Sequence, residues 1–198
     1  MQEAIRSYTL ADGRRLKVYA DEDPRDPRED DNVGKLCIRK HRNYTFPNEL
    51  KFDFDSDYDW ENVEDRLKEL EKTHYLFWLD MYEHSGIVFS FSGKWMNCRF
   101  DTSNDCGFIA VPMGTDKITG HICTGYEDAL SVAKNELKYW NAYCTGDVYG
   151  YVIEHKERRV NEKWEEKFEW EHDDSCRWYY ELDDILDEVK DLSPNEID

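Results

Sequence analysis

The chain has 198 residues, of which 45 are acidic and 26 are basic, so its formal net charge is −19. This charge disfavours direct binding to nucleic acid and to anionic membranes, because both require a basic face. Aromatic residues make up 15% of the chain, which argues against disorder. No apolar run is long enough to cross a membrane, and the first residues lack the apolar segment of a secretory signal. We therefore expect a folded cytosolic protein.

The first elements in chain order are predicted to be a hairpin, a loop and a strand. Two β-prone runs, 5–10 and 15–20, flank Ala11-Asp12-Gly13, which is a typical hairpin turn. Residues 21–32 contain two prolines and seven acids, and this composition excludes a regular element. Residues 35–40 are predicted to form a short strand.

The middle of the chain is predicted to alternate helices with buried strands. A 3-4-3 spacing of apolar residues predicts an amphipathic helix that contains Trp60, Val63, Leu67 and Leu70. The runs at 75–82, 87–91 and 107–111 predict strands, of which the first is central in its sheet. A longer helix is predicted over 130–144, with Gly146 placed to end it.

The last third of the chain is predicted to contain two strands and a helix. A strand over 148–153 precedes a second strand with one solvated face, which carries Trp164, Phe168 and Trp170. The last helix is predicted over 182–192. We expect an α+β fold, a mainly antiparallel sheet with about three helices packed on one face. Its core domain would be residues 1–155, with residues 156–198 as an acidic strand–helix extension packed on that core.

The negative charge is gathered in three blocks, 21–32, 53–65 and 154–198, and the last of these holds 17 acids and 7 bases. On the last predicted helix, acids occupy the face opposite Leu182, Ile185 and Val189. A rigid row of carboxylates resembles a phosphate backbone and would attract the basic groove of a nucleic-acid enzyme. The alternative is a solvated face that keeps an acidic protein soluble.

A partner-binding surface is predicted from this helix and the nearby tryptophans, because acids would steer the partner and aromatic rings would anchor it. Its predicted residues are Asp183, Asp184, Asp187, Glu188, Asp191, Trp164, Trp170 and Trp178.

A divalent metal site is the second candidate. The carboxylates of the 21–32 loop are hard oxygen ligands for calcium or magnesium, although their spacing is not that of an EF-hand. Arg25 and Arg28 are alternative partners for these acids. The predicted ligands are Asp21, Asp23, Asp26, Asp31 and His84. The six cysteines include no CxxC pair, so a zinc site would have to be assembled from distant residues.

An enzyme is the alternative function. The 21–32 acids with His84 and Asp101 would form a metal-dependent hydrolase or a nucleotide-modifying enzyme. Ser85, Cys98 or Cys106 would be candidate nucleophiles near these residues. The chain has no GxSxG elbow and no phosphate-binding glycine loop, so no catalytic motif is recognised.

Four short motifs occur in order along residues 17–155: DEDPRDPR followed by DNVG, then YEHSGI, GFI and GDVYGY. Together they resemble a family of small, uncharacterised proteins from phages and mobile elements of Gram-positive bacteria. The family has no assigned chemistry, so no catalytic residue is implied. The resemblance implies a phage accessory protein that acts in the cytoplasm of a bacterial host.

Phage accessory proteins often counter host defence, and many of these are acidic. By this analogy, we expect an inhibitor of anti-CRISPR or antirestriction type, not an enzyme, that binds a CRISPR effector nuclease or a restriction enzyme. It would contact neither nucleic acid nor a membrane directly, and its only cofactor would be a divalent ion such as zinc, calcium or magnesium.

Overall fold

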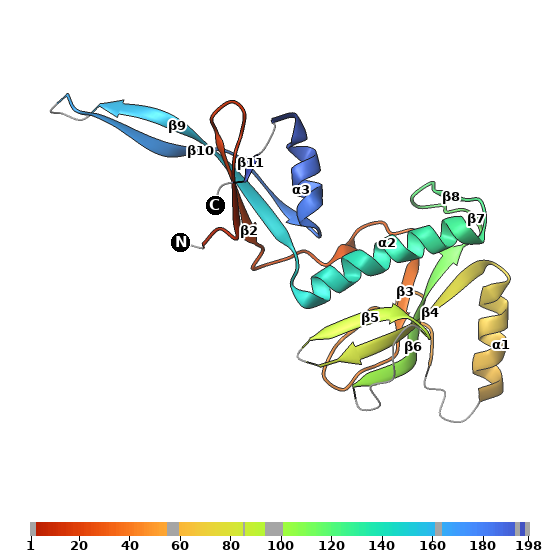
Figure 1. Ribbon diagram of the computed structural model, residues 1–198. Helices are drawn as coiled ribbons and strands as arrows, with labels where there is room; N and C mark the ends of the chain where they lie inside the picture. Colours follow the sequence, from red (N-terminus) through yellow and green to blue (C-terminus); the bar gives the residue numbers. More distant parts are fainter. Residues whose placement is uncertain are drawn as a thin grey trace. The chain divides into compact units, whose positions relative to one another are not determined.

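A computed structural model describes residues 3–54, 60–84, 86–93, 101–160, 164–192 and 195–196 (Figure 1). The chain divides into two compact units. The terminal unit combines Met1–Arg25 with Gly146–Asp198, and the central unit is Asp26–Thr145. The fold is α+β, as the sequence predicts, and the described residues contain three α-helices and antiparallel strand pairing.

The central unit is built on a four-stranded antiparallel sheet of order β3-β6-β4-β5. Its strands are β3 (Lys35–Ile38), β6 (Thr102–Pro112), β4 (His74–Glu83) and β5 (Ile87–Phe91). The predicted central strand lies inside the sheet as β4. Short elements complete this unit: η1 (Pro27–Glu29), β7 (Gly114–Thr115) and β8 (Ile122–Cys123).

The two helices of the central unit cover opposite faces of this sheet, whereas the sequence led us to expect one face. Helix α2 (Tyr126–Thr145) buries Ala129, Ala133, Leu137 and Trp140 against one face. Helix α1 (Trp60–Glu71) packs on the other face with Phe52 and Phe54. Because both faces are covered, β6 is buried without interruption from Cys106 to Val111. Gly146 ends α2 with a φ of 77°, a conformation that glycine adopts without strain.

The terminal unit is built on a five-stranded antiparallel sheet of order β10-β9-β2-β1-β11. Its strands are β10 (Glu166–Tyr179), β9 (Tyr149–Val160), β2 (Arg15–Ala20), β1 (Arg6–Thr9) and β11 (Asn195–Glu196). The β1–β2 hairpin turns at Asp12-Gly13, as predicted. Two helical segments follow β10, α3 (Leu182–Glu188) and η2 (Lys190–Leu192).

The division into units runs differently from the expected boundary at residue 155. Strand β9 passes through that position, and its residues 149–154 pair with β2 near the amino terminus. The C-terminal acidic segment therefore shares a sheet and a core with residues 1–25. This core includes Leu16 and Val18 of β2 and Ile185 of α3.

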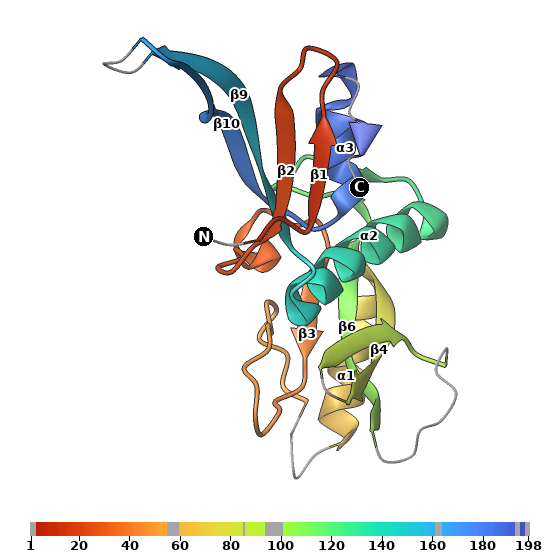
Figure 2. The same cartoon turned by 60° about the vertical axis from the view of Figure 1, so that its left-hand side comes forward.

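Beyond residue 154, β9 has left β2 and pairs with β10 alone (Figure 2). We call residues 155–160 and 164–171 the ribbon, a two-stranded extension of the sheet. In the described part of the chain, no helix is both long and apolar enough to cross a membrane.

Candidate functional site

Helix α3 is fixed to the sheet of the terminal unit by its apolar side. Ile185 is fully buried and Val189 is 3% exposed, and both pack against the core of β1, β2 and β9. The helix is shorter than predicted. It ends at Glu188, and Asp191 lies on the following turn η2. Asp183 and Asp184 stand in the first turn, where the helix dipole favours negative charge.

The carboxylates on the outer side of this segment are not neutralised. We call Asp183, Asp184, Asp187 and Asp191 the α3 acidic surface, of which Asp184 is half-buried and the others are exposed. Within the described residues, no lysine, arginine or histidine lies within ion-pair distance of these four carboxylates. The segment therefore presents fixed negative charge to solvent from a helix anchored in a core.

Glu188, the fifth predicted acid of this segment, is also exposed, but its carboxylate has hydrogen-bond partners within the terminal unit. Its carboxylate accepts a hydrogen bond from the Tyr151 hydroxyl at 3.1 Å and a second from the Tyr179 hydroxyl. Burial and these contacts raise the pKa of Tyr151 to about 12. The sequence could not show this orientation, because both tyrosines come from strands outside the helix.

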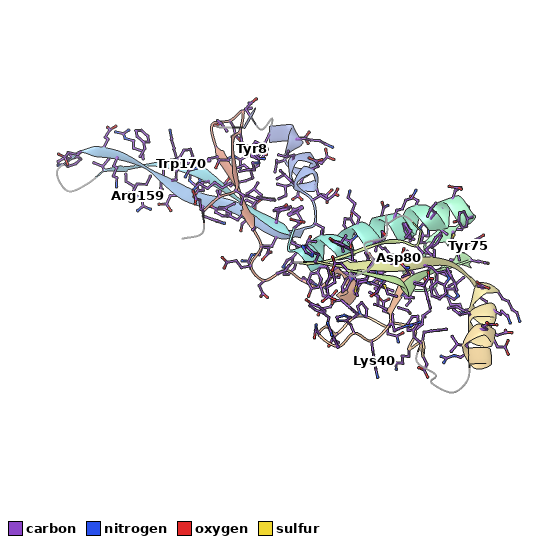
Figure 3. All side chains as sticks on the ribbon, turned by 60° about the horizontal axis from the view of Figure 1, so that its bottom comes forward. Tyr8, Lys40, Tyr75, Asp80, Arg159 and Trp170 are labelled. Carbon is purple, nitrogen blue, oxygen red and sulfur yellow. The ribbon has the colours of Figure 1, made fainter. Side chains whose placement is uncertain are left out.

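The ribbon is also rich in acidic residues, but basic side chains lie next to them. Arg158 pairs with Glu166, and Arg159 lies 3.2 Å from Glu169 and also pairs with Glu171. Figure 3 labels Arg159 on the ribbon, together with Trp170. The Lys167 ammonium lies 2.8 Å from Glu169 and lowers the pKa of that carboxyl. The ribbon is thus a surface of paired charges.

The three predicted tryptophan anchors do not join the α3 acidic surface. Trp170 lies against the Arg15 guanidinium, 4.2 Å from its ring centroid, and the Lys156 ammonium, at 5.1 Å. Arg15 alternates along β2 with Leu16, which is buried under α3, so Trp170 lies on the opposite face of the sheet. Trp164 is 87% exposed and precedes β10 by two residues, and Trp178 lies near the carboxyl end of β10.

The predicted metal ligands of the 21–32 loop are divided between the two units. Asp21 and Asp23 belong to the terminal unit, and Asp26 and Asp31 belong to the central unit. Asp26 accepts a hydrogen bond from the Arg28 backbone N–H at 2.8 Å and caps η1.

Arg28 does not neutralise these loop acids. Its buried guanidinium pairs with Glu49 at 2.6 Å and with Glu136 at 3.1 Å. The burial of this cluster raises the pKa of Glu136 despite its basic partner. We interpret the cluster as a structural link between the loop, the sheet edge and α2.

Two residues of the alternative enzyme site lie close together. His84 Nδ1 is 3.6 Å from Asp101 Oδ2. Cys106 is buried, which raises the pKa of its thiol to about 12 and disfavours the nucleophilic thiolate. Ser85 and Cys98 lie outside the described residues. In the part of the chain that is described, no three His, Cys, Asp or Glu side chains form a group able to hold a metal ion. The predicted ligand set is therefore not assembled.

Residues 55–59 of the 53–65 acidic block lie outside the described residues. Two of its described members, Glu64 and Asp65, lie 3.7 and 3.4 Å from the Lys68 ammonium. This block adds no described row of unpaired carboxylates, so the α3 acidic surface is the strongest candidate site.

No family model matches this chain, and no curated protein or solved structure matches it either.

Proposed function

We propose that this protein is a binding protein whose α3 acidic surface occupies a basic, nucleic-acid-binding surface of another protein. The observation that carries the proposal is a set of four carboxylates, three on the anchored helix α3 and one on the turn η2, that have no basic partner among the described residues, whereas acids of the ribbon are paired. Unpaired charges on a rigid support act on an approaching partner without first breaking internal ion pairs.

The proposed partner is a bacterial defence nuclease, either a CRISPR effector or a restriction enzyme. Such enzymes hold nucleic acid in positively charged channels, and a row of fixed carboxylates competes for the same lysines and arginines. The resemblance to phage proteins supports this choice of partner. The protein would then act as a phage-encoded inhibitor in the host cytoplasm, without a catalytic step of its own.

The test is an inhibition assay on a panel of purified CRISPR effectors and restriction enzymes. The wild-type protein should inhibit DNA cleavage by a member of the panel at about 50 mM salt and lose most of this effect near 200 mM. The D183N/D187N/D191N variant should inhibit weakly at both salt concentrations.

The matched control is E166Q/E169Q/E171Q, which removes three carboxylates whose charges are paired on the ribbon. This control should inhibit like the wild type. Equal inhibition by both triple variants, or inhibition that does not depend on salt, would show that the α3 acidic surface is not the binding surface.

A further inference from the structure

A hollow of about 620 Å³ opens in the terminal unit where β2, β9 and β10 come together. Its lining includes Tyr19, Asp21, Gly150, Arg177 and Trp178. Tyr19 follows the fully buried Val18 on β2, so it points to the face of the sheet opposite α3. Gly150 pairs with Tyr19 across the strands and leaves this position without a side chain. The volume is in the range of ligand sites, about 300–1,000 Å³.

A buried carboxylate with an unused oxygen lies in this hollow. The Asp21 side chain is fully buried, and its Oδ1 accepts a hydrogen bond from the Asp23 backbone N–H at 3.1 Å. Its Oδ2 receives no hydrogen bond from the described residues. The nearest cation is Arg177, whose Nε is 4.0 Å from Oδ2, beyond hydrogen-bond length. Burial of a carboxylate oxygen without a donor is costly, so the site favours a cationic donor.

Aromatic rings line the same hollow as this carboxylate. Trp178 is 47% exposed, and the Arg25 guanidinium lies 5.8 Å from its ring centroid, so the ring already contacts one arginine of this chain and keeps an exposed part for another. Trp178 also has a φ of 71°, an uncommon conformation for a residue other than glycine. Residues held in such conformations cluster at ligand-binding and active sites.

We propose that this hollow binds the guanidinium group of an arginine side chain supplied by a partner protein. The planar guanidinium would donate hydrogen bonds to Asp21 Oδ2 and stack on the aromatic rings, a combination that an ammonium group matches less well. The identity of the partner rests on the proposed function, since a nucleic-acid-binding surface is rich in arginine. The choice of a guanidinium group as the ligand follows from the residues of the hollow and does not depend on the proposed function.

Arg177 forms a long ion pair with the carboxylate, 4.0 Å from Nε to Oδ2, but donates no hydrogen bond to it. Its side chain is 64% exposed, and its stem lies over Gly150, 3.3 Å from where a β-carbon would stand there. An incoming guanidinium would displace this loosely held side chain. Removal of Arg177 should therefore tighten binding of the ligand, whereas removal of Asp21 should weaken it.

The experiment is a titration with N-acetyl-arginine methylamide followed by ¹⁵N–¹H NMR on the full chain, with the citrulline analogue as a neutral isostere. The arginine probe should shift amide signals of Tyr19, Gly150 and Trp178 with a dissociation constant on the order of 1 mM. The citrulline probe should bind at least about tenfold more weakly.

Variants separate this site from an adventitious cation effect. D21N keeps an oxygen for the Asp23 N–H and should weaken arginine binding about tenfold or more, and R177Q should strengthen it. W178A should weaken binding, while W164A, the matched exposed tryptophan with a φ of 61°, should leave it unchanged. Thermal melts establish that each variant is folded.

The proposal is overturned if the arginine and citrulline probes bind alike, or if W164A and W178A lose binding equally. It is also overturned if R177Q abolishes binding, because Arg177 would then hold the ligand and not compete with it. A failure of nuclease inhibition would leave the arginine titration unaffected, so the two proposals fail by different readouts.

Discussion

The α3 segment and the ribbon are both rich in acidic residues, yet they place their charges in opposite situations. On the ribbon, Arg158, Arg159 and Lys167 neutralise neighbouring glutamates. On α3, Asp183 and Asp187 face solvent without a basic partner among the described residues. Composition alone treats the two regions as one acidic block. We therefore expect pairing, not the number of acids, to determine which surface attracts a basic partner.

The two regions also differ in how firmly they are attached to the fold. Ile185 of α3 is fully buried, whereas Phe168 of the ribbon is 62% exposed. The I185A variant should lower the free energy of unfolding of the terminal unit by about 2–5 kcal/mol, because it leaves a cavity in the core. The F168A variant should change it by about 0.5 kcal/mol or less.

Native-state hydrogen exchange at the core amides of β2 and β9 measures the free energy of unfolding of the terminal unit in each variant. Similar losses for I185A and F168A would contradict the distinction between an anchored helix and a solvated ribbon.

Glu188 differs from the acids of the α3 acidic surface because its carboxylate accepts hydrogen bonds from Tyr151 and Tyr179. The Y151F variant, which lacks the hydroxyl, should have a free energy of unfolding about 1.5–3 kcal/mol lower at neutral pH. This is the usual range for a hydrogen bond to a charged group. The folded state raises the pKa of Tyr151 from about 10 to about 12. This contribution is complete below pH 10 and is lost as the pH rises through 12.

The stability difference between wild type and Y151F should therefore shrink between pH 10 and 12. Urea denaturation across this range measures it, and E188Q should show the same convergence with the wild type. A difference that stays constant with pH would mean that the Tyr151 hydroxyl does not depend on Glu188.

The ribbon should attract a basic partner when its basic side chains are removed. The R158Q/R159Q variant leaves Glu166, Glu169 and Glu171 with fewer positive partners. Its stability should fall by only about 0–1 kcal/mol, since these pairs are exposed. Its association with a basic nuclease should become faster at low salt, which stopped-flow kinetics would detect. Unchanged kinetics would mean that pairing does not control attraction.

The local elements could be predicted because their signals lie within short stretches of sequence. The Asp12-Gly13 turn defines the β1–β2 hairpin, and the apolar spacing that begins at Leu130, with Gly146 behind it, predicts α2. The division into two units could not be predicted in this way. It depends on the pairing of β2 with β9, which are separated by the whole central unit.

The candidate site was predicted in part for the same reason. Helical periodicity placed Asp183 and Asp187 opposite Ile185, as the structure has them. The orientation of Glu188, the stacking of Trp170 and the burial of Asp21 all depend on residues from distant strands. The alternation of Val18 with Tyr19 along β2 is a local signal that could have placed the Tyr19 ring on the face of the sheet opposite α3, but this placement is not among our predictions from the sequence.

The most direct test of the central claim is the association rate constant with an inhibited nuclease, measured against salt for two matched variants. We predict that D183N/D187N/D191N lowers the rate constant about tenfold or more at low salt and flattens its salt dependence. E166Q/E169Q/E171Q should follow the wild-type curve. If E166Q/E169Q/E171Q lowers the association rate constant and D183N/D187N/D191N leaves it unchanged, α3 is not the partner-binding surface.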